Sequence, residues 1–164
     1  MPTFKGNPVK LYGSLLEVGV NAPVVKLVGG DLGDVVVGGA SGSYQLLSVV
    51  PSIDTGVCQV QTKAFNEKAA SLSNVKFYCV SADLPFALGR FCGAEGLKGI
   101  VPLSDFRDKL FGKVYGLLLN DGALAGLLTR AVLVVDPDGK LVYQEVCEEI
   151  TSEPNYEKAL AAIK

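Results

Sequence analysis

The sequence predicts an α/β fold with a central mixed β-sheet flanked by helices and preceded by an N-terminal β-hairpin. One short apolar run is followed by a segment with helical spacing, and a second by the N-cap and proline of a helix start; this alternation of strand and helix is typical of a parallel sheet. Later, two more apolar runs flank the turn-forming segment 136–139, which predicts an antiparallel pair at the far side of the sheet. The length of 164 residues fits one domain, so residues 1–164 are expected to form a single unit.

The first half of the chain supplies a hairpin, a strand and a helix. Residues 1–16 alternate loosely around a Gly-Asn-Pro turn, which predicts a small hairpin extension. Residues 45–50 form a nearly continuous apolar run ending at Pro51, as in a strand that is buried on both faces. After a polar loop, apolar residues recur at helical spacing from Val57 to Leu72, which predicts an amphipathic helix.

The second half of the chain continues the pattern. Residues 75–80 predict another buried strand, after which Asp83 offers an N-cap and Pro85 a first-turn proline for a further helix. Residues 131–135 and 141–146 predict the antiparallel pair. A closing helix is expected to begin at Glu153-Pro154 and to carry Tyr156, Leu160 and Ile163 on one face.

Composition argues against several classes of function. Lys and Arg number 15 against 17 Asp and Glu, so the formal charge of −2 provides no positive field for nucleic acid. Every apolar run is interrupted well before the roughly 18 residues that a membrane span needs. The first residues lack the apolar core and cleavage site of a secretory signal, so a cytoplasmic location is expected.

The chain has no histidine, which excludes Ser-His-Asp and Cys-His catalysis and HExxH zinc sites. Its four cysteines are Cys58, Cys79, Cys92 and Cys147, and no two form the CxxC pair of a zinc ribbon or a dithiol reductant. GxGxxG and Walker loops are absent as well. Neither a metal nor another cofactor is therefore expected.

Cys58 falls in the first turn of the predicted helix after the buried strand. Free N–H groups and the helix dipole favour an anion there, so a thiolate at this position is stabilised, above all beside a cation. Without histidine that cation must be Arg or Lys, and Arg130, just before a buried strand, is the best candidate. The alternatives remain an inert core thiol at Cys58, a surface arginine at Arg130 and a simple helix cap at Thr55.

The motif around this cysteine is specific. Pro51, Thr55 and Cys58 have the PxxxTxxC spacing, and a second cysteine and an arginine segment follow in order. Over nearly its whole length the chain resembles the thiol peroxidase family of atypical two-cysteine peroxiredoxins, whose fold is thioredoxin-like. The segments that carry the resemblance are residues 3–9, 18–19, 22–23, 49–58, 83–87, 90–92, 103–107 and 124–132.

The resemblance implies a role for each site residue. Cys58 is the expected peroxidatic cysteine, which attacks a hydroperoxide and becomes a sulfenic acid. Thr55 is expected to hydrogen-bond the thiolate or peroxide, Arg130 to hold both together, and Pro51 to shield the sulfur from water. Cys92 is the expected resolving cysteine, giving an intramolecular Cys58–Cys92 disulfide that thioredoxin reduces.

A disulfide requires its two Cα atoms to lie about 4.4 to 6.8 Å apart, which two cysteines on separate helices seldom satisfy. One or both helix starts are therefore expected to unwind during turnover, helped by Gly56, Gly89 and Gly93. Cys79 is expected to be a packed core thiol. Cys147 departs from the family's usual apolar residue, and no role is predicted for it.

The resemblance further implies a homodimer and a preference for alkyl hydroperoxides over hydrogen peroxide. Two other functions stay open at this point. The first is a peroxide-responsive sensor in which the same disulfide alters the binding of a partner protein. The second is an interaction domain with an inert thiol. Steady consumption of peroxide with a thioredoxin system separates an enzyme from a sensor, because a sensor is oxidised once and stops.

Overall fold

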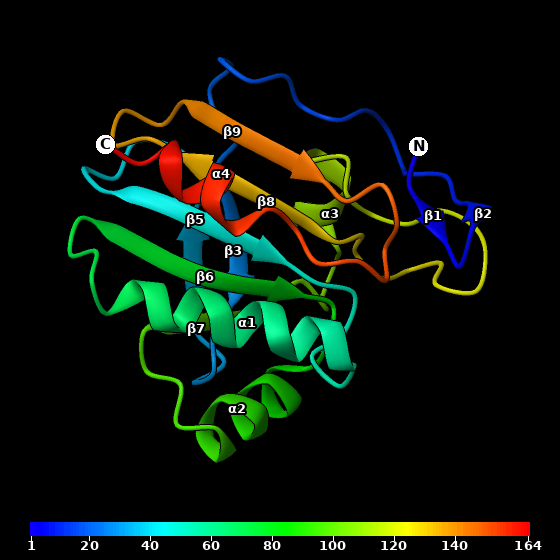
Figure 1. The fold of residues 1–164 in the computed structure, drawn as a ribbon, viewed down its shortest axis with the longest axis horizontal. Coiled ribbons are helices and arrows are strands. Elements are labelled where there is room, and N and C mark those ends of the chain that lie inside the picture. The colour runs from blue at the N-terminus through cyan, green and yellow to red at the C-terminus, as the bar shows by residue number, and fades with distance from the viewer.

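The apolar run after residue 44 forms an interior strand, as its lack of polar alternation predicts. In the computed structural model of residues 1–164, this strand, β5, pairs in parallel with β6 and antiparallel with β8. It belongs to a seven-stranded mixed sheet with the order β4-β3-β7-β6-β5-β8-β9 (Figure 1). The strands are β3 (Val25–Val28), β4 (Asp34–Val37), β5 (Tyr44–Val49), β6 (Val75–Ser81), β7 (Ile100–Ser104), β8 (Ala131–Val135) and β9 (Leu141–Val146).

A separate two-stranded hairpin, β1 (Thr3–Phe4) and β2 (Asn7–Pro8), lies beyond one end of this sheet (Figure 1). The helices are α1 (Gly56–Ala69), α2 (Pro85–Ala94), α3 (Leu110–Val114) and α4 (Tyr156–Ala161). None of these four helices combines the length and apolar character needed to cross a membrane. The predicted α/β architecture, its antiparallel β8–β9 pair and its N-terminal hairpin are confirmed.

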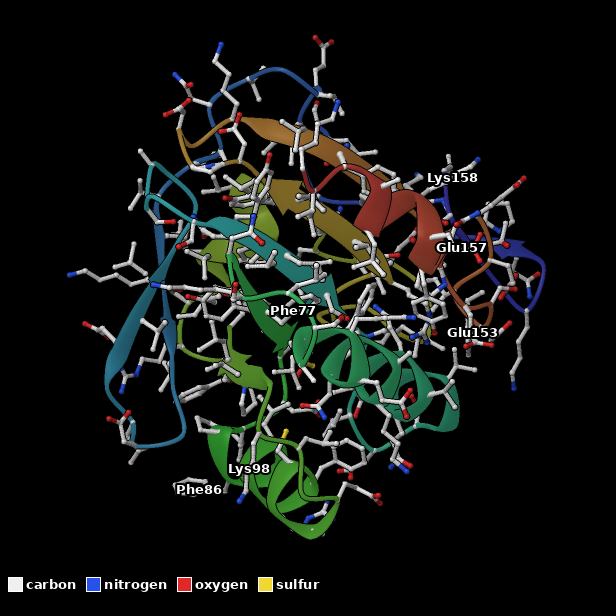
Figure 2. The ribbon with its side chains drawn as sticks, turned by 60° about the vertical axis from the view of Figure 1, so that its left-hand side comes forward. Phe77, Phe86, Lys98, Glu153, Glu157 and Lys158 are labelled. Atoms are coloured by element: carbon white, nitrogen blue, oxygen red, sulfur yellow. The ribbon has the colours of Figure 1, made fainter.

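The two faces of the sheet carry separate apolar cores. One core packs α1, α2 and α4 against the sheet, and Phe77 of β6 lies buried beneath α1 (Figure 2). The other core packs α3 against the opposite face through Phe111 and Tyr115. Phe86, near the start of α2, instead points outward with 68% of its surface exposed (Figure 2). Cys58 lies in the first of these cores, at the end of the sheet where α1 begins.

Some predicted boundaries are wrong. Leu84, not Asp83, is the N-cap of α2, because the Asp83 carboxylate accepts hydrogen bonds from the loop before α1 instead. The last helix begins at Tyr156 with Asn155 as its cap, and Ile163 lies beyond its end. Asn155 succeeds as a cap because its side chain accepts a hydrogen bond from the N–H of Lys158.

Asp105 gives this fold a predictable pH dependence. Its carboxylate accepts the N–H groups of Phe111 (3.1 Å) and Gly112 (2.9 Å), which satisfies two donors at the start of α3. Burial nevertheless raises the pKa of Asp105 from 3.8 to about 6, because desolvation disfavours the charged form. A group whose pKa is raised on folding adds stability at low pH and loses that contribution as the pH rises through the folded value.

We therefore expect the free energy of unfolding of the wild type, relative to Asp105→Asn, to fall by roughly 2 to 3 kcal/mol between pH 4 and pH 7. The measurement is a urea titration of both proteins across this range. Parallel pH profiles for the two proteins would contradict the assignment.

Candidate active site

The loop ahead of α1 is fixed by a partly buried carboxylate. Asp83, just after β6, accepts hydrogen bonds from the hydroxyl of Ser52 (2.8 Å) and the N–H of Ile53 (2.7 Å). The hydroxyl of Ser81, at the end of β6, donates to the same carboxylate at 2.8 Å. These contacts join two strand-to-helix loops, and they hold the start of α1 at a defined position over the sheet.

Cys58 is the third residue of α1 and its side chain is completely buried. Its Sγ lies 2.7 Å from Oγ1 of Thr55 and 3.3 Å from Nη2 of Arg130. Thr55 occupies the N-cap position, yet its hydroxyl makes no capping bond to the helix. The hydroxyl of Thr55 also lies 2.9 Å from the carbonyl oxygen of Ser52. Its single hydrogen can be donated either to this oxygen or to Sγ of Cys58.

Arg130 is held by three different acceptors. Its side chain is buried, with only 3% of the residue exposed. Nε donates to the carbonyl of Ile150 at 2.6 Å, Nη1 donates to Oε1 of Gln61 at 3.0 Å, and Nη2 donates to Sγ of Cys58. Gln61 is itself fixed, because its amide nitrogen donates to the hydroxyl of Ser48 at 2.8 Å. These hydrogen bonds fix the orientation of the guanidinium, with Nη2 directed at the sulfur.

No carboxylate forms an ion pair with Arg130. The three ion pairs of the molecule are Lys63–Glu95, Arg90–Asp54 and Arg107–Asp34. A buried cation is costly unless an anion or several hydrogen bonds compensate it. The carbonyl of Ile150 and the amide of Gln61 are neutral, so the sulfur of Cys58 is the one hydrogen-bond acceptor of the guanidinium that can carry a negative charge.

A cavity of about 230 Å³ opens beside these residues. Pro51, Thr55 and Arg130 line it, whereas the fully buried Cys58 does not. The remaining wall is largely apolar, and its apolar members are Phe4, Val57, Leu124, Leu127 and Ile150. A molecule in the cavity therefore meets apolar side chains together with Thr55 and Arg130, the two polar neighbours of Sγ.

The other three cysteines have different surroundings. All four are free thiols. Burial raises the pKa of Cys79 to about 12 and that of Cys147 to about 11, and it also raises the pKa of Cys92. These thiols are therefore neutral near pH 7. Cys79 lies in the apolar core beneath the helices, as expected for a packed thiol.

Cys92 shares a core with Cys58 but lies near the end of α2, where the carbonyl of Cys92 accepts the N–H of Leu97. Cys92 thus lies away from the start of its own helix. The expectation that one or both helix starts unwind during turnover stays a prediction.

The sequence-based interpretation placed Pro51, Thr55, Cys58 and Arg130 together, and the structure brings all four to one cavity or its buried edge. It missed Gln61. A signal existed, because a buried glutamine three residues after Cys58 interrupts the apolar face of the helix. It also missed the carbonyl of Ile150 and the carboxylate of Asp83, for which local sequence carries no signal.

The fold and the site are those of a redoxin, and the model of the Redoxin family matches residues 17–160 of the chain. Two curated relatives named thiol peroxidase are each 48% identical to this chain. The Helicobacter pylori J99 protein aligns over 99% of this chain and 98% of its own, and the Mycobacterium tuberculosis H37Rv protein over 98% and 96%. A crystal structure of a peroxiredoxin-like protein from Aquifex aeolicus superposes with a TM-score of 0.94 at 44% identity, covering 99% of this chain and 96% of the other.

The chain belongs to the thiol peroxidase family of peroxiredoxins, and it is a thiol-dependent peroxidase with the thioredoxin-like fold. The family resemblance seen in the sequence motifs is thereby confirmed.

Proposed function

We propose that Cys58 is the peroxidatic nucleophile and that its thiolate attacks one oxygen of a hydroperoxide. The S–O bond forms as the O–O bond breaks, which oxidises the sulfur to a sulfenic acid. The departing alkoxide or hydroxide takes up a proton and leaves as alcohol or water. The observation that carries this proposal is the buried Arg130: among the hydrogen-bond acceptors of its guanidinium, only Sγ of Cys58, at 3.3 Å, can become an anion.

The neighbours of Sγ suit this reaction. The guanidinium of Arg130 can hold the thiolate and a peroxide oxygen at once, because it carries several N–H donors in a fixed plane. The hydroxyl of Thr55 can turn from the carbonyl of Ser52 toward the sulfur or the peroxide. Donors that are already in place stabilise the charge that develops on the leaving oxygen. Pro51, buried at the cavity, limits access of water to the sulfur.

We propose that Cys92 resolves the sulfenic acid. Its thiol attacks the oxidised Sγ of Cys58, water leaves, and an intramolecular disulfide forms. Both side chains are buried in one core, so the end of α2 must open for them to meet. Gly89 and Gly93 lie in α2, and no packing contact requires a glycine at either position. Because glycine weakens a helix, both residues lower the cost of that opening. Thioredoxin is the proposed reductant that restores both thiols.

The cavity supports alkyl hydroperoxides as preferred substrates, with hydrogen peroxide also reduced. Phe4, Leu124, Leu127 and Ile150 can cover an alkyl or aryl group while the peroxide reaches the polar side of the cavity. Burying such a group contributes about 25 cal/mol per Å² of apolar surface, a gain that hydrogen peroxide lacks.

The chain is proposed to form one domain, residues 1–164 with 1–16 as an extension, because the two apolar cores share the strands of one sheet. A homodimer in the cytoplasm is proposed on the strength of family membership. Four free thiols suit a compartment in which thiols stay reduced.

Intact-mass measurement after one equivalent of hydroperoxide tests the assignment of both cysteines. The wild type should lose two hydrogens, because a disulfide forms. Cys58→Ser should keep its mass, since its remaining thiols are neutral near pH 7. Cys92→Ser should gain one oxygen, because the sulfenic acid has no resolving partner. Oxygen uptake by Cys58→Ser, or disulfide formation in Cys92→Ser, would assign the roles to other cysteines.

A further inference from the structure

Glu149 fastens the N-terminal hairpin to the segment that follows β9. One carboxylate oxygen, Oε2, accepts hydrogen bonds from the hydroxyl of Thr3 (2.6 Å) and the N–H of Gly6 (3.1 Å). The other oxygen, Oε1, accepts the N–H of Lys5 at 3.0 Å and the N–H and hydroxyl of Thr151 at 3.2 and 2.9 Å. A single side chain thus joins two parts of the chain that are more than 140 residues apart in sequence.

The backbone of the hairpin turn is shaped to hold this carboxylate. Lys5 and Gly6 have φ angles of 51° and 80°, so both adopt the left-handed conformation of a tight hairpin turn. Consecutive N–H groups in such a turn form a concave anion-binding site, and Glu149 occupies it. The hydrogen bonds from Thr3 and Gly6 lower the pKa of Glu149 to about 2, so the carboxylate is ionised at any physiological pH.

The hairpin cannot hold its position through its own strands. β1 and β2 have two residues each, and an isolated two-stranded hairpin is at best marginally stable. Lysine is also not among the residues that favour a positive φ. The hydrogen bonds to the Glu149 carboxylate supply the missing constraint at the turn. Two backbone bonds add to it at Thr3, whose N–H donates to the carbonyl of Glu148 at 2.7 Å and whose carbonyl accepts the N–H of Ile150 at 2.8 Å.

The hydrogen bonds of Glu149 to the hairpin fix the position of Phe4. This residue lines the cavity beside Arg130 and packs on a small apolar cluster around Val9, Leu119 and Ile150. Figure 1 shows the hairpin lying next to the loop that precedes β8 and the segment that follows β9. Leu124 and Leu127, in that loop, also line the cavity and join the same cluster. Releasing the hairpin would remove one apolar wall of the cavity and leave Cys58, Thr55 and Gln61 untouched.

We propose that Glu149 is a positioning residue for substrate selection: it holds the hairpin against the body of the protein so that Phe4 closes the apolar side of the hydroperoxide cavity. The inference rests on the proposed reaction at Cys58. It adds that affinity for bulky apolar hydroperoxides depends on a carboxylate that touches neither the substrate nor the reacting sulfur. Hydrogen peroxide, which has no group for Phe4 to cover, does not depend on it.

The test compares Glu149→Ala with Glu148→Ala, a neighbouring change that removes the same charge from a side chain without hydrogen bonds. Steady-state rates are measured with cumene hydroperoxide and with hydrogen peroxide. We expect Glu149→Ala to raise KM for cumene hydroperoxide about 5- to 10-fold, which corresponds to losing part of one aromatic contact. The kcat of this variant should stay within about 2-fold of the wild type. Its constants for hydrogen peroxide, and all constants of Glu148→Ala, should stay within about 2-fold of the wild type.

Phe4→Ala should reproduce the rise in KM, and combining it with Glu149→Ala should add little, because both changes remove the same wall. Amide hydrogen exchange at Lys5 and Gly6 should accelerate in Glu149→Ala and not in Glu148→Ala. Equal losses with both peroxides, an equal effect of Glu148→Ala, or additive effects of the two substitutions would overturn the proposal. Failure of the reaction at Cys58 is recognised separately, because Cys58→Ser would then still reduce hydrogen peroxide.

Discussion

Cys58→Ser is expected to lose peroxidase turnover by at least about 10³-fold with every hydroperoxide. A serine hydroxyl does not ionise near pH 7, so Arg130 and the N–H groups at the start of α1 find no anion to stabilise. The volume of the side chain hardly changes, and the fold should survive the substitution. The measurement is the steady-state consumption of peroxide with thioredoxin, thioredoxin reductase and NADPH.

Cys147→Ser is the matched control for this substitution. Cys147 is buried and its pKa is raised to about 11, so it holds its proton at neutral pH. Its replacement should keep turnover within about 2-fold, a change of less than 0.5 kcal/mol. Full turnover by Cys58→Ser, or equal losses in both variants, would remove Cys58 from the centre of the reaction. A sensor would behave differently again, since the wild type itself would consume one equivalent and stop.

Arg130→Met should lower kcat/KM by about 10²- to 10³-fold, the range seen when one preorganised donor to a developing charge is removed. Methionine keeps much of the length of the side chain and removes the charge that faces Sγ of Cys58. The loss should be similar for hydrogen peroxide and for alkyl hydroperoxides, because the guanidinium acts on the oxygen atoms and the sulfur rather than on an alkyl group.

Arg130→Met also leaves the carbonyl of Ile150 and the amide oxygen of Gln61 without a donor, and each buried orphan costs about 1 to 3 kcal/mol. Thermal unfolding therefore has to be measured beside activity. Arg130→Lys restores the charge without the planar fork, and it should recover part of the rate. A fully active Arg130→Met would show that the buried cation has no part in the reaction.

The sequence predicted the residues around Cys58 better than the distant contacts that hold these residues in place. Cys58 and Thr55 are close in sequence at a strand-to-helix turn, so the local pattern brings these two together. Arg130 was predicted as the cation because histidine is absent, and the pairing of β8 with β5 is what brings it to that turn. The apolar runs at β5, β6, β8 and β9 likewise carry a clear signal, because buried strands need few polar residues.

What the sequence did not predict depends on contacts between distant segments. Strand β7 contains Pro102, which argues against a central strand, and its neighbour β3 pairs with it at only one residue. The α3 helix has five residues, too few for a periodic pattern. In the sequence, nothing distinguishes Glu149 from other acidic residues, because its partners lie in the distant N-terminal hairpin. Asp83 is similar, because its carboxylate binds the loop ahead of α1 rather than capping the nearby helix.

In the proposed catalytic cycle, the anchored first turn of α2 should speed the step in which this helix re-forms. The side chain of Asp83 binds Ser52 and Ile53, and its carbonyl accepts a hydrogen bond from the hydroxyl of Ser104, directly ahead of the residues that begin α2. Starting a helix is slow and unfavourable, whereas lengthening an existing one is easy. In the proposed resolving step the end of α2 opens to bring Cys92 to Cys58, and the anchored first turn then remains as a nucleus. After reduction the helix regrows from it in one direction, without a new nucleation event.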